Sequence, residues 1–233
     1  MRKVVFISLL CNVFALAAIV ILVFKFGGIS NILFKFNHQH ALAKMDHRNS
    51  SFASTPPSKG SIIFLGDSIT EFGEWAELFP SYRVLNRGIA GDGIMGVLNR
   101  LSEVKRHDPK LIFLMIGVND LCFHPPKEVI QSYRKLLDKM LIEFNSSQLI
   151  IQAILPVNNN IYSTGTENEQ IDEVNRQIAN FCAKKGITNI NLSSVFKDED
   201  NNLKKAFTQD GIHINGIAYN AWSKSLIPWL PIE

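Results

Sequence analysis

The sequence predicts an α/β protein in which a parallel sheet lies between two layers of helices. Five short β-rich apolar runs follow one another along the chain, and longer mixed segments separate them. The runs lack strict apolar/polar alternation, as expected for strands that are buried on both faces. Alternating strands and helices imply right-handed crossovers between parallel strands. The expected architecture is therefore a flavodoxin-like three-layer α/β/α sandwich with a five-stranded parallel sheet.

The predicted elements follow from these runs. The strands read SIIFLG (61–66), RVLNRG (83–88), LIFLMIG (111–117), QLIIQAIL (148–155) and TNINLS (188–193). Helices are expected over Glu71–Phe79, Gly93–His107, Pro126–Phe144, Asn168–Lys185 and Ala218–Ile227. The fourth of these helices is followed by Gly186, a residue type that commonly ends helices.

Composition and charge exclude several classes of protein. The chain has 233 residues, of which 46% are hydrophobic, so intrinsic disorder is excluded. Residues before Lys59 carry a net charge of +5, whereas the rest of the chain carries −2. This near-neutral body lacks the basic face that nucleic-acid binding requires, so no nucleic-acid partner is expected. Cys11, Cys122 and Cys182 form no CxxC pair, and no structural disulfide is predicted.

The N-terminal segment predicts a membrane anchor. Val4–Phe24 is apolar and uncharged, and a helix of this length matches the hydrocarbon core of a bilayer, about 30 Å. Basic residues crowd before this run and are strung out after it, which favours a cytoplasmic N-terminus and an extracytoplasmic body. We therefore predict a single-pass membrane protein with residues 1–36 as anchor and juxtamembrane segment. The alternative is a signal peptide cleaved near Ala15–Ala17, which would release a secreted protein.

A polar linker is predicted over residues 37–59, before a globular domain over residues 60–233. His38, His40 and His47 fall in this segment and could suggest a metal site. Because the segment has no cysteine and one nearby carboxylate, a solvated linker is the better interpretation, and no metal is predicted.

Chemistry-bearing residues follow the predicted strands at the edge of the sheet where ligands bind in such folds. Ser68 follows the first strand, Gly88 ends the second, and Asn119 follows the third. Asp210 and His213 stand three residues apart near the C-terminus, close enough for the acid to orient the base. These residue types together supply a nucleophile, a general base, an orienting carboxylate and oxyanion donors, which is the set that acyl transfer requires.

Each of these residues also has a structural interpretation when taken alone. A serine after a strand is usually a helix cap, and a lone histidine is more often structural than catalytic. Asp67, Asp92 and Asp120 are as typical of turns and caps as of catalysis, so no role is predicted for them. The occurrence of the whole set at successive strand ends favours the catalytic interpretation.

Four motifs carry a family resemblance. GDSIT, NRGIAGD, IGVND and DGIH resemble, in order, the four blocks of the GDSL or SGNH hydrolase superfamily. The resemblance extends from Ser61 to Ala218. Within it, the stretch from Trp75 through VLNRGIAGDG is most similar to the branch that contains platelet-activating-factor acetylhydrolase catalytic subunits and bacterial acylhydrolases.

The resemblance implies an SGNH hydrolase fold and an esterase or acylhydrolase that needs no cofactor. Ser68 would be the nucleophile, His213 the general base and Asp210 its orienting carboxylate. The oxyanion hole would be formed by the N–H groups of Ser68 and Gly88 and by the Asn119 side-chain amide. The expected substrate is a small-molecule, glycan or lipid ester, with short-chain or acetyl esters favoured.

Two other classes of function are left open. GDGIMG (91–96) matches the G-x-G-x-x-G pattern of dinucleotide-binding oxidoreductases, but it lies away from the strand end and Asp92 would face a pyrophosphate. A membrane-tethered, non-catalytic binding module of the same fold is the second alternative. The sequence predicts no oligomeric state.

Overall fold

The computed structural model describes residue 12 and residues 43–231. By its internal contacts the chain divides into two units, Met1–His47 and Arg48–Glu233. The second unit contains the sheet and all the residues of the predicted site.

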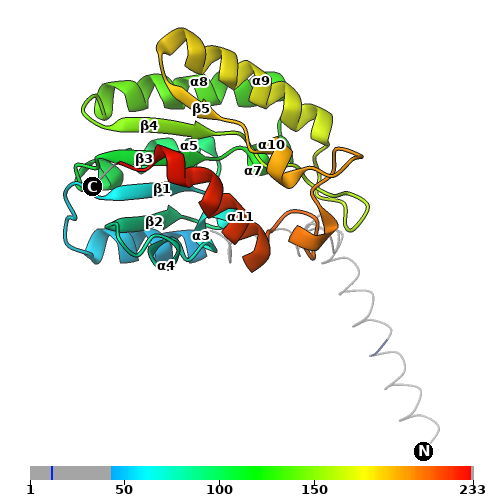
Figure 1. Cartoon of the computed structure of the whole chain (residues 1–233), viewed down its shortest axis with the longest axis horizontal. Helices are drawn as coiled ribbons and strands as arrows, with labels where there is room; N and C mark the ends of the chain where they lie inside the picture. Colours follow the sequence, from blue (N-terminus) through cyan, green and yellow to red (C-terminus); the bar gives the residue numbers. More distant parts are fainter. Residues whose placement is uncertain (1–11, 13–42, 232–233) are drawn as a thin grey trace, which may run out of the picture. The chain divides into compact units, whose positions relative to one another are not determined.

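Five parallel strands form one sheet, as the sequence predicts (Figure 1). The strands are β1 (Ile62–Gly66), β2 (Val84–Gly88), β3 (Leu111–Met115), β4 (Gln148–Gln152) and β5 (Thr188–Ile190). Their order is β2-β1-β3-β4-β5, with every neighbouring pair parallel. The chain therefore leaves β1 in one direction and, after β2, crosses to β3 on the other side. Such a reversal is where open α/β sheets bind ligands, outside the carboxyl ends of the strands.

Helices cover both faces of the sheet. The helices are α3 (Ser68–Glu71), α4 (Trp75–Leu78), α5 (Ile94–Asn99), α6 (Leu101–Lys105), α7 (Val118–Leu121), α8 (Pro126–Glu143), α9 (Asn168–Lys185), α10 (Ser193–Phe196) and α11 (Gly216–Leu226), with short 3-10 helices η1 (Lys205–Phe207) and η2 (Ile227–Trp229). On one face α8 packs between α5 and α9. On the other face α11, red in Figure 1, meets α4, where the rings of Trp75 and Trp222 lie edge to face with centroids 4.8 Å apart. Trp75 also stacks on Phe64 of β1 at 4.0 Å, so α4 packs directly on this face of the sheet.

The predicted helices Pro126–Phe144, Asn168–Lys185 and Ala218–Ile227 form close to their expected bounds, but the two that were expected near the site are each divided. Over residues 71–79 the chain forms α3 and α4 instead of one helix, and α3 begins at Ser68 because the Asp67 carboxylate accepts the Ile69 N–H at 3.0 Å. Over residues 93–107 it forms α5 and α6, which meet at Arg100. The Arg100 guanidinium turns inward to bind the Gly66 carbonyl at 3.0 Å, which accounts for the interruption.

Part of the segment that was predicted to be a polar linker is helical. Residues 43–54 are helical, and Phe52 is only 4% exposed. The polar composition of this segment concealed the helix because a single buried aromatic residue produces no helical periodicity in the sequence.

The predicted membrane anchor lies outside the described residues, apart from Asn12, and so do His38 and His40. Among the residues that the structure describes, no helix is both long and apolar enough to cross a membrane. In the same residues, Cys122 and Cys182 are free thiols.

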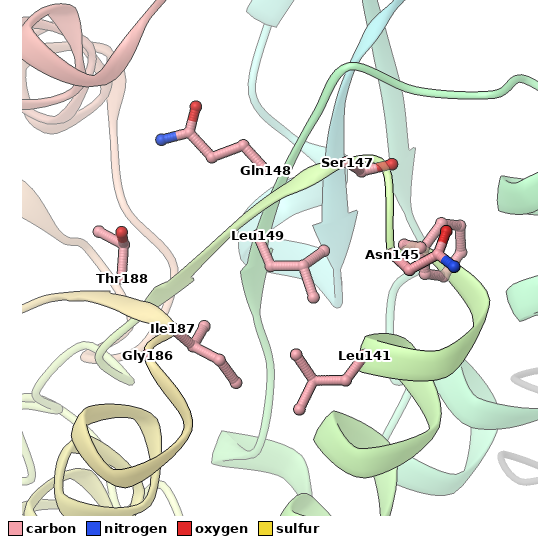
Figure 2. Close-up of a pocket in the computed structure, with 9 residues that line it drawn as sticks. Leu141, Asn145, Ser147, Gln148, Leu149, Gly186, Ile187 and Thr188 are labelled. Carbon is pink, nitrogen blue, oxygen red and sulfur yellow. The ribbon is translucent and has the colours of Figure 1, made fainter.

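A hollow lies at the amino ends of β4 and β5, the edge opposite to the predicted site (Figure 2). It has a volume of about 330 Å³ and is lined by Leu141, Leu149 and Ile187 among others. Because parallel strands all point the same way, this hollow is separated from Ser68 by the length of the sheet.

Candidate active site

Ser68 stands where β1 turns into α3. It is the first residue of α3, and its side chain is buried at 6% exposure. The capping bond from Ile69 N–H to Asp67 fixes the start of this turn. The Ser68 hydroxyl is thereby held at the carboxyl edge of the sheet. The neighbouring strands β2 and β3 end level with β1 at this edge.

The His213 ring connects this hydroxyl to a carboxylate. His213 Nε2 lies 3.0 Å from Ser68 Oγ, and Nδ1 lies 2.6 Å from Asp210 Oδ2. Asp210 Oδ1 accepts the backbone N–H groups of Ile212 at 3.0 Å and His213 at 2.8 Å. Burial opposes ionisation of Asp210, but these bonds outweigh it and lower the pKa of the carboxyl to about 2. An ionised Asp210 selects the tautomer with a proton on Nδ1, which leaves Nε2 free to accept the Ser68 proton.

The loop that bears Asp210 and His213 is fastened to the body of the domain. The Asn158 N–H donates to the Gly211 carbonyl at 2.7 Å, and the Gly211 N–H donates to Thr208 Oγ1 at 2.9 Å. These bonds hold the middle of the loop between its two ionisable residues. The imidazole is thus positioned by backbone contacts as well as by its own carboxylate.

The Asn119 amide reaches the same edge from α7. Its Nδ2 donates one hydrogen to the Asp92 carbonyl at 2.9 Å, which orients the amide plane and leaves the second hydrogen for another acceptor. Asn119 is therefore brought to the loop that follows β2.

The role predicted for Gly88 does not agree with the structure. The Ile89 N–H donates to the Gly66 carbonyl on β1 at 3.1 Å, so the preceding N–H points to the other side of β2. There the Gly88 N–H donates to Asn86 Oδ1 at 2.9 Å. The Gly88 N–H therefore points away from β1, the strand that precedes Ser68, and it already has an acceptor.

Gly91, three residues further on, has the properties that Gly88 lacks. Its φ is +80°, and a Cβ there would meet nothing within 4 Å. Within the described part of the chain its N–H has no hydrogen-bond partner. It immediately precedes Asp92, whose carbonyl holds Asn119. In the sequence, Gly91 stands out only as part of a glycine pattern. The sequence signal that could have identified Gly91 as a candidate donor is its position in NRGIAGD, next to Asp92.

A buried ion pair supports this loop. Arg100 Nε lies 2.9 Å from Asp92 Oδ2, and both side chains are almost fully buried. Burial raises the pKa of Asp92, and the Arg100 charge opposes that shift. The second guanidinium contact, to the Gly66 carbonyl, ties the loop to the end of β1. Asp92 and Arg100 therefore connect the loop that contains Gly91 to β1, the strand that precedes Ser68.

Asp67 and Asp120, for which no role was predicted, are hydrogen-bond acceptors; Asp67 is buried and Asp120 is half-buried. Asp120 accepts the Ile94 N–H at the start of α5, at 3.1 and 3.2 Å. Burial raises the pKa of Asp120, and it raises the pKa of Asp67 to about 7. In the described residues Asp67, Asp92 and Asp120 thus form a carboxyl cluster behind the site, each with its own backbone or arginine partner.

The dinucleotide interpretation of GDGIMG (91–96) does not agree with this geometry. A pyrophosphate site requires free N–H groups at a helix N-terminus. Here the Ile94 N–H donates to Asp120, and the Gly93 N–H donates to Asp92 at 3.0 Å. Carboxylates therefore already occupy the position of the phosphate.

Comparisons with known proteins find a matching family model and related sequences. The model of the GDSL-like Lipase/Acylhydrolase family matches residues 64–221. Human platelet-activating factor acetylhydrolase IB subunit alpha1 is 22% identical over 180 residues, covering 75% of this chain and 77% of the relative.

Two solved structures share the fold. A Streptococcus pneumoniae protein named for platelet activating factor is 24% identical with a TM-score of 0.77, over 86% of this chain and 99% of the other. A GDSL-like lipase from Bacteroides thetaiotaomicron is 18% identical with a TM-score of 0.66, over 81% and 99% of the two chains. At these identities the structural likeness establishes the fold alone.

Proposed function

The chain belongs to the GDSL-like lipase/acylhydrolase family of hydrolases, and from that premise we propose that it cleaves carboxylic esters through a Ser68–His213–Asp210 triad. The observation that carries this proposal is the 3.0 Å contact between Ser68 Oγ and His213 Nε2, two atoms from residues 145 positions apart. A histidine that accepts from a serine and is itself held by an ionised carboxylate has the arrangement of a nucleophile with its base.

The mechanism has two symmetrical halves. His213 Nε2 takes the Ser68 proton as Oγ attacks the ester carbonyl, and Asp210 stabilises the imidazolium that forms. His213 then gives the proton to the departing alcohol, which leaves an acyl-Ser68 ester. A water molecule, deprotonated by His213 in the same way, attacks this ester and releases the acid with Ser68 restored.

The oxyanion that forms in each half needs hydrogen-bond donors. We assign this role to the N–H of Ser68 at the start of α3, the free hydrogen of Asn119 Nδ2 and the N–H of Gly91, which takes the place first expected for Gly88. Gly91 is supported by its unoccupied N–H and by the contact of Asn119 with the next residue. Removal of one such donor typically costs about 10²–10³-fold in turnover.

Short-chain or acetyl esters are the proposed substrates. The relatives named as acetylhydrolases support an acetyl preference, and the family name supports lipid esters. The apolar sequence Val4–Phe24 supports a single-pass anchor with residues 60–233 on the extracytoplasmic side, or a secreted domain if the leader is cleaved. Lipids and O-acylated glycans would both be reachable from there. Activity on acetylated sugars, lysophospholipids and p-nitrophenyl esters of graded length would separate these substrate classes.

The function is tested with the full-length protein and p-nitrophenyl acetate. We expect hydrolysis by the wild type and at least a 10³-fold loss in Ser68→Ala, because the acyl-enzyme can no longer form. Ser102→Ala removes an exposed hydroxyl from α6 and serves as the matched control. A fluorophosphonate probe should label the wild type and the control but not Ser68→Ala. Unchanged hydrolysis by Ser68→Ala would reject the assignment, and a wild type that neither hydrolyses nor labels would indicate a binding module.

A further inference from the structure

The segment before the family match contacts the site from outside the sheet. We use the name arm for residues 48–58, which precede the matched residues 64–221. From the contacts of this arm we propose that Arg48 and Glu71 are positioning residues that hold the Gly91 loop, residues 89–92, in its oxyanion-binding conformation. The inference rests on the proposed esterase function and extends it to residues that do not touch the substrate's reacting atoms.

The arm is docked on the domain by an aromatic residue between two guanidinium groups. The Phe52 side chain is buried, and the guanidinium carbons of Arg48 and Arg87 lie 4.8 and 4.5 Å from the centre of its ring. Such cation–π contacts are attractive and strengthen with burial. The Arg106 guanidinium donates to the Phe52 carbonyl at 2.7 Å. The end of the helix is thereby fixed against β2 and α6.

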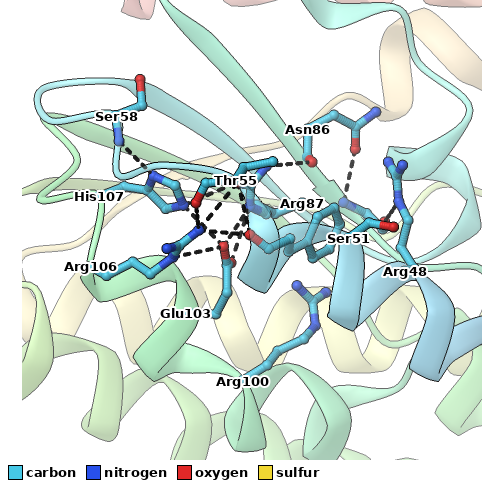
Figure 3. A network of polar contacts seen from close by, with 12 residues as sticks. Arg48, Ser51, Thr55, Ser58, Asn86, Arg87, Arg100, Glu103, Arg106 and His107 are labelled. Carbon is cyan, nitrogen blue, oxygen red and sulfur yellow. Dashed lines mark hydrogen bonds and ion pairs between the residues drawn. The ribbon is translucent and has the colours of Figure 1, made fainter.

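The end of the arm is held by a second buried contact. The Ser58 N–H donates to His107 Nδ1 at 2.9 Å, and His107 is fully buried (Figure 3). On the other side of the ring, Nε2 lies 2.9 Å from Arg87 Nη2 and 3.0 Å from Glu103 Oε1. Glu103 in turn accepts from Arg87 Nε at 3.1 Å. The arm is therefore attached to the domain at two places, Phe52 and Ser58.

This docking places Arg48 next to Glu71, the residue that binds the Gly91 loop. Arg48 Nε lies 3.5 Å from Glu71 Oε1 and donates to the Gly88 carbonyl at 3.3 Å. The other oxygen of Glu71, Oε2, accepts the Ala90 N–H at 2.5 Å. Ala90 immediately precedes Gly91, so one carboxylate links the arm to the peptide that carries the proposed oxyanion donor.

The two ends of the loop depend on different supports. Asp92 at its far end is held by Arg100 and Asn119. At its near end the Ala90 N–H relies on Glu71, which also belongs to the α3 turn that begins with Ser68. Glu71 therefore sets the distance between the nucleophile's helix and the loop. Both Glu71 and Arg48 are partly exposed, so without its arginine the carboxylate can rotate toward water and release Ala90.

A direct role in binding substrate is the competing explanation. Arg48, Glu71 and Phe72 border a hollow of about 490 Å³ beside the site. If Arg48 bound part of the substrate there, its removal would raise KM and leave kcat unchanged. A positioning role predicts the opposite, because the oxyanion is present in the transition state and not in the bound ester.

The test uses point variants of the full-length protein with p-nitrophenyl acetate. We expect kcat to fall about three- to tenfold in Arg48→Ala and about ten- to a hundredfold in Glu71→Ala, with KM within about twofold, because small displacements of a catalytic group are costly. Arg48→Lys keeps the charge and should recover most of the loss. Glu71→Gln keeps an oxygen for Ala90 and should lose less than Glu71→Ala. Arg176→Ala, which breaks an exposed ion pair on α9, is the matched control.

Affinity for an aryl trifluoromethyl ketone gives an independent readout. This compound forms a tetrahedral oxyanion adduct with a nucleophilic serine, so its Ki should rise in proportion to the fall in kcat/KM across the series. The inference is overturned if Arg48→Ala and Glu71→Ala match Arg176→Ala in kcat, or if only KM changes. A wild type without esterase activity, or an active Ser68→Ala, would instead reject the proposed function. Arg48→Ala alters a partly exposed side chain, so its comparison stands even if Glu71→Ala folds poorly.

Discussion

The two sides of the proposed catalytic serine are built in different ways. On one side, Asp210 and His213 lie three residues apart in a single loop and are both substantially exposed. On the other side, the loop of residues 89–92 is held by Glu71 from α3, Arg100 from the junction of α5 and α6, and Asn119 from α7. The proton-transfer side is therefore a local structure, whereas the oxyanion side exists only once distant elements have packed.

This difference also appears in the ionisation of the acidic groups. Hydrogen bonds lower the pKa of Asp210 to about 2, against the opposing effect of burial. Burial raises the pKa values of Asp67, Asp92 and Asp120 on the other side. The local side thus keeps a negative charge near water, while on the assembled side burial disfavours ionisation of the carboxyl groups.

The largest effect is expected on the local side, from Asp210→Asn. Asparagine Oδ1 can still accept the N–H groups of Ile212 and His213, so the loop should keep its shape. Its NH₂ group, however, would face His213 Nδ1 and favour the tautomer with the proton on Nε2, which cannot accept from Ser68. We expect kcat to fall on the order of 10³–10⁴-fold, by analogy with other serine triads, with the melting temperature nearly unchanged.

Asp198→Asn provides the matched control, since Asp198 also accepts backbone N–H groups in an exposed turn but lies outside the site. The expected contrast is a large loss of kcat in one variant and none in the other. Full activity of Asp210→Asn would remove Asp210 from the triad. The contrast between local and assembled sides would then have to be drawn for His213 alone.

A smaller effect is expected on the assembled side, from Asn119→Ala. This change removes a proposed oxyanion donor and also frees the Asp92 carbonyl from its partner. We expect kcat to fall about 10²–10³-fold with little change in KM. Asn145→Ala, at the surface after α8, is a suitable control. Wild-type turnover in Asn119→Ala would mean that the Gly91 and Ser68 N–H groups stabilise the oxyanion without it.

The same distinction explains how far the sequence could predict the molecule. The five strands and the helices α8, α9 and α11 follow from apolar runs and helix ends, which are local signals. The positions of Asp210 and His213 could also be predicted, because three residues of spacing already place acid beside base. The family motifs then connect Ser68 and Asn119 to them, although no distance between these residues follows from the sequence alone.

The features that could not be predicted from the sequence all depend on long-range contacts. The Gly88 N–H was expected in the oxyanion hole, but the direction of an N–H in a strand depends on which side its neighbour pairs. The interruption at Arg100 depends on an ion pair with Asp92. The helical segment around Phe52 has polar residues throughout, and its docking requires the guanidinium of Arg87 from β2. No local pattern in the sequence encodes these partners.

The smallest effect is expected on stability, from Asp67→Asn on the assembled side. Burial, with the nearby charges of Asp92 and Asp120, raises the pKa of Asp67 to about 7 from an ordinary value of 3.8, although the Ile69 N–H opposes the shift. Between these values the folded protein holds a proton that the unfolded chain has lost. The stabilisation from this proton is therefore complete below about pH 4 and declines as pH rises to about 7.

Asparagine can still accept the Ile69 N–H but does not titrate, so Asp67→Asn should remove this part of the pH dependence. In urea unfolding at pH 5 and pH 8, the difference in unfolding free energy between the two pH values should shrink by roughly 2–3 kcal/mol relative to the wild type. Asp138→Asn, which alters an exposed carboxyl on α8, should leave that difference unchanged. Parallel pH profiles for wild type and Asp67→Asn would show that Asp67 is ionised in the folded protein throughout this range. The contrast between an ionised Asp210 and a protonated Asp67 would then fail.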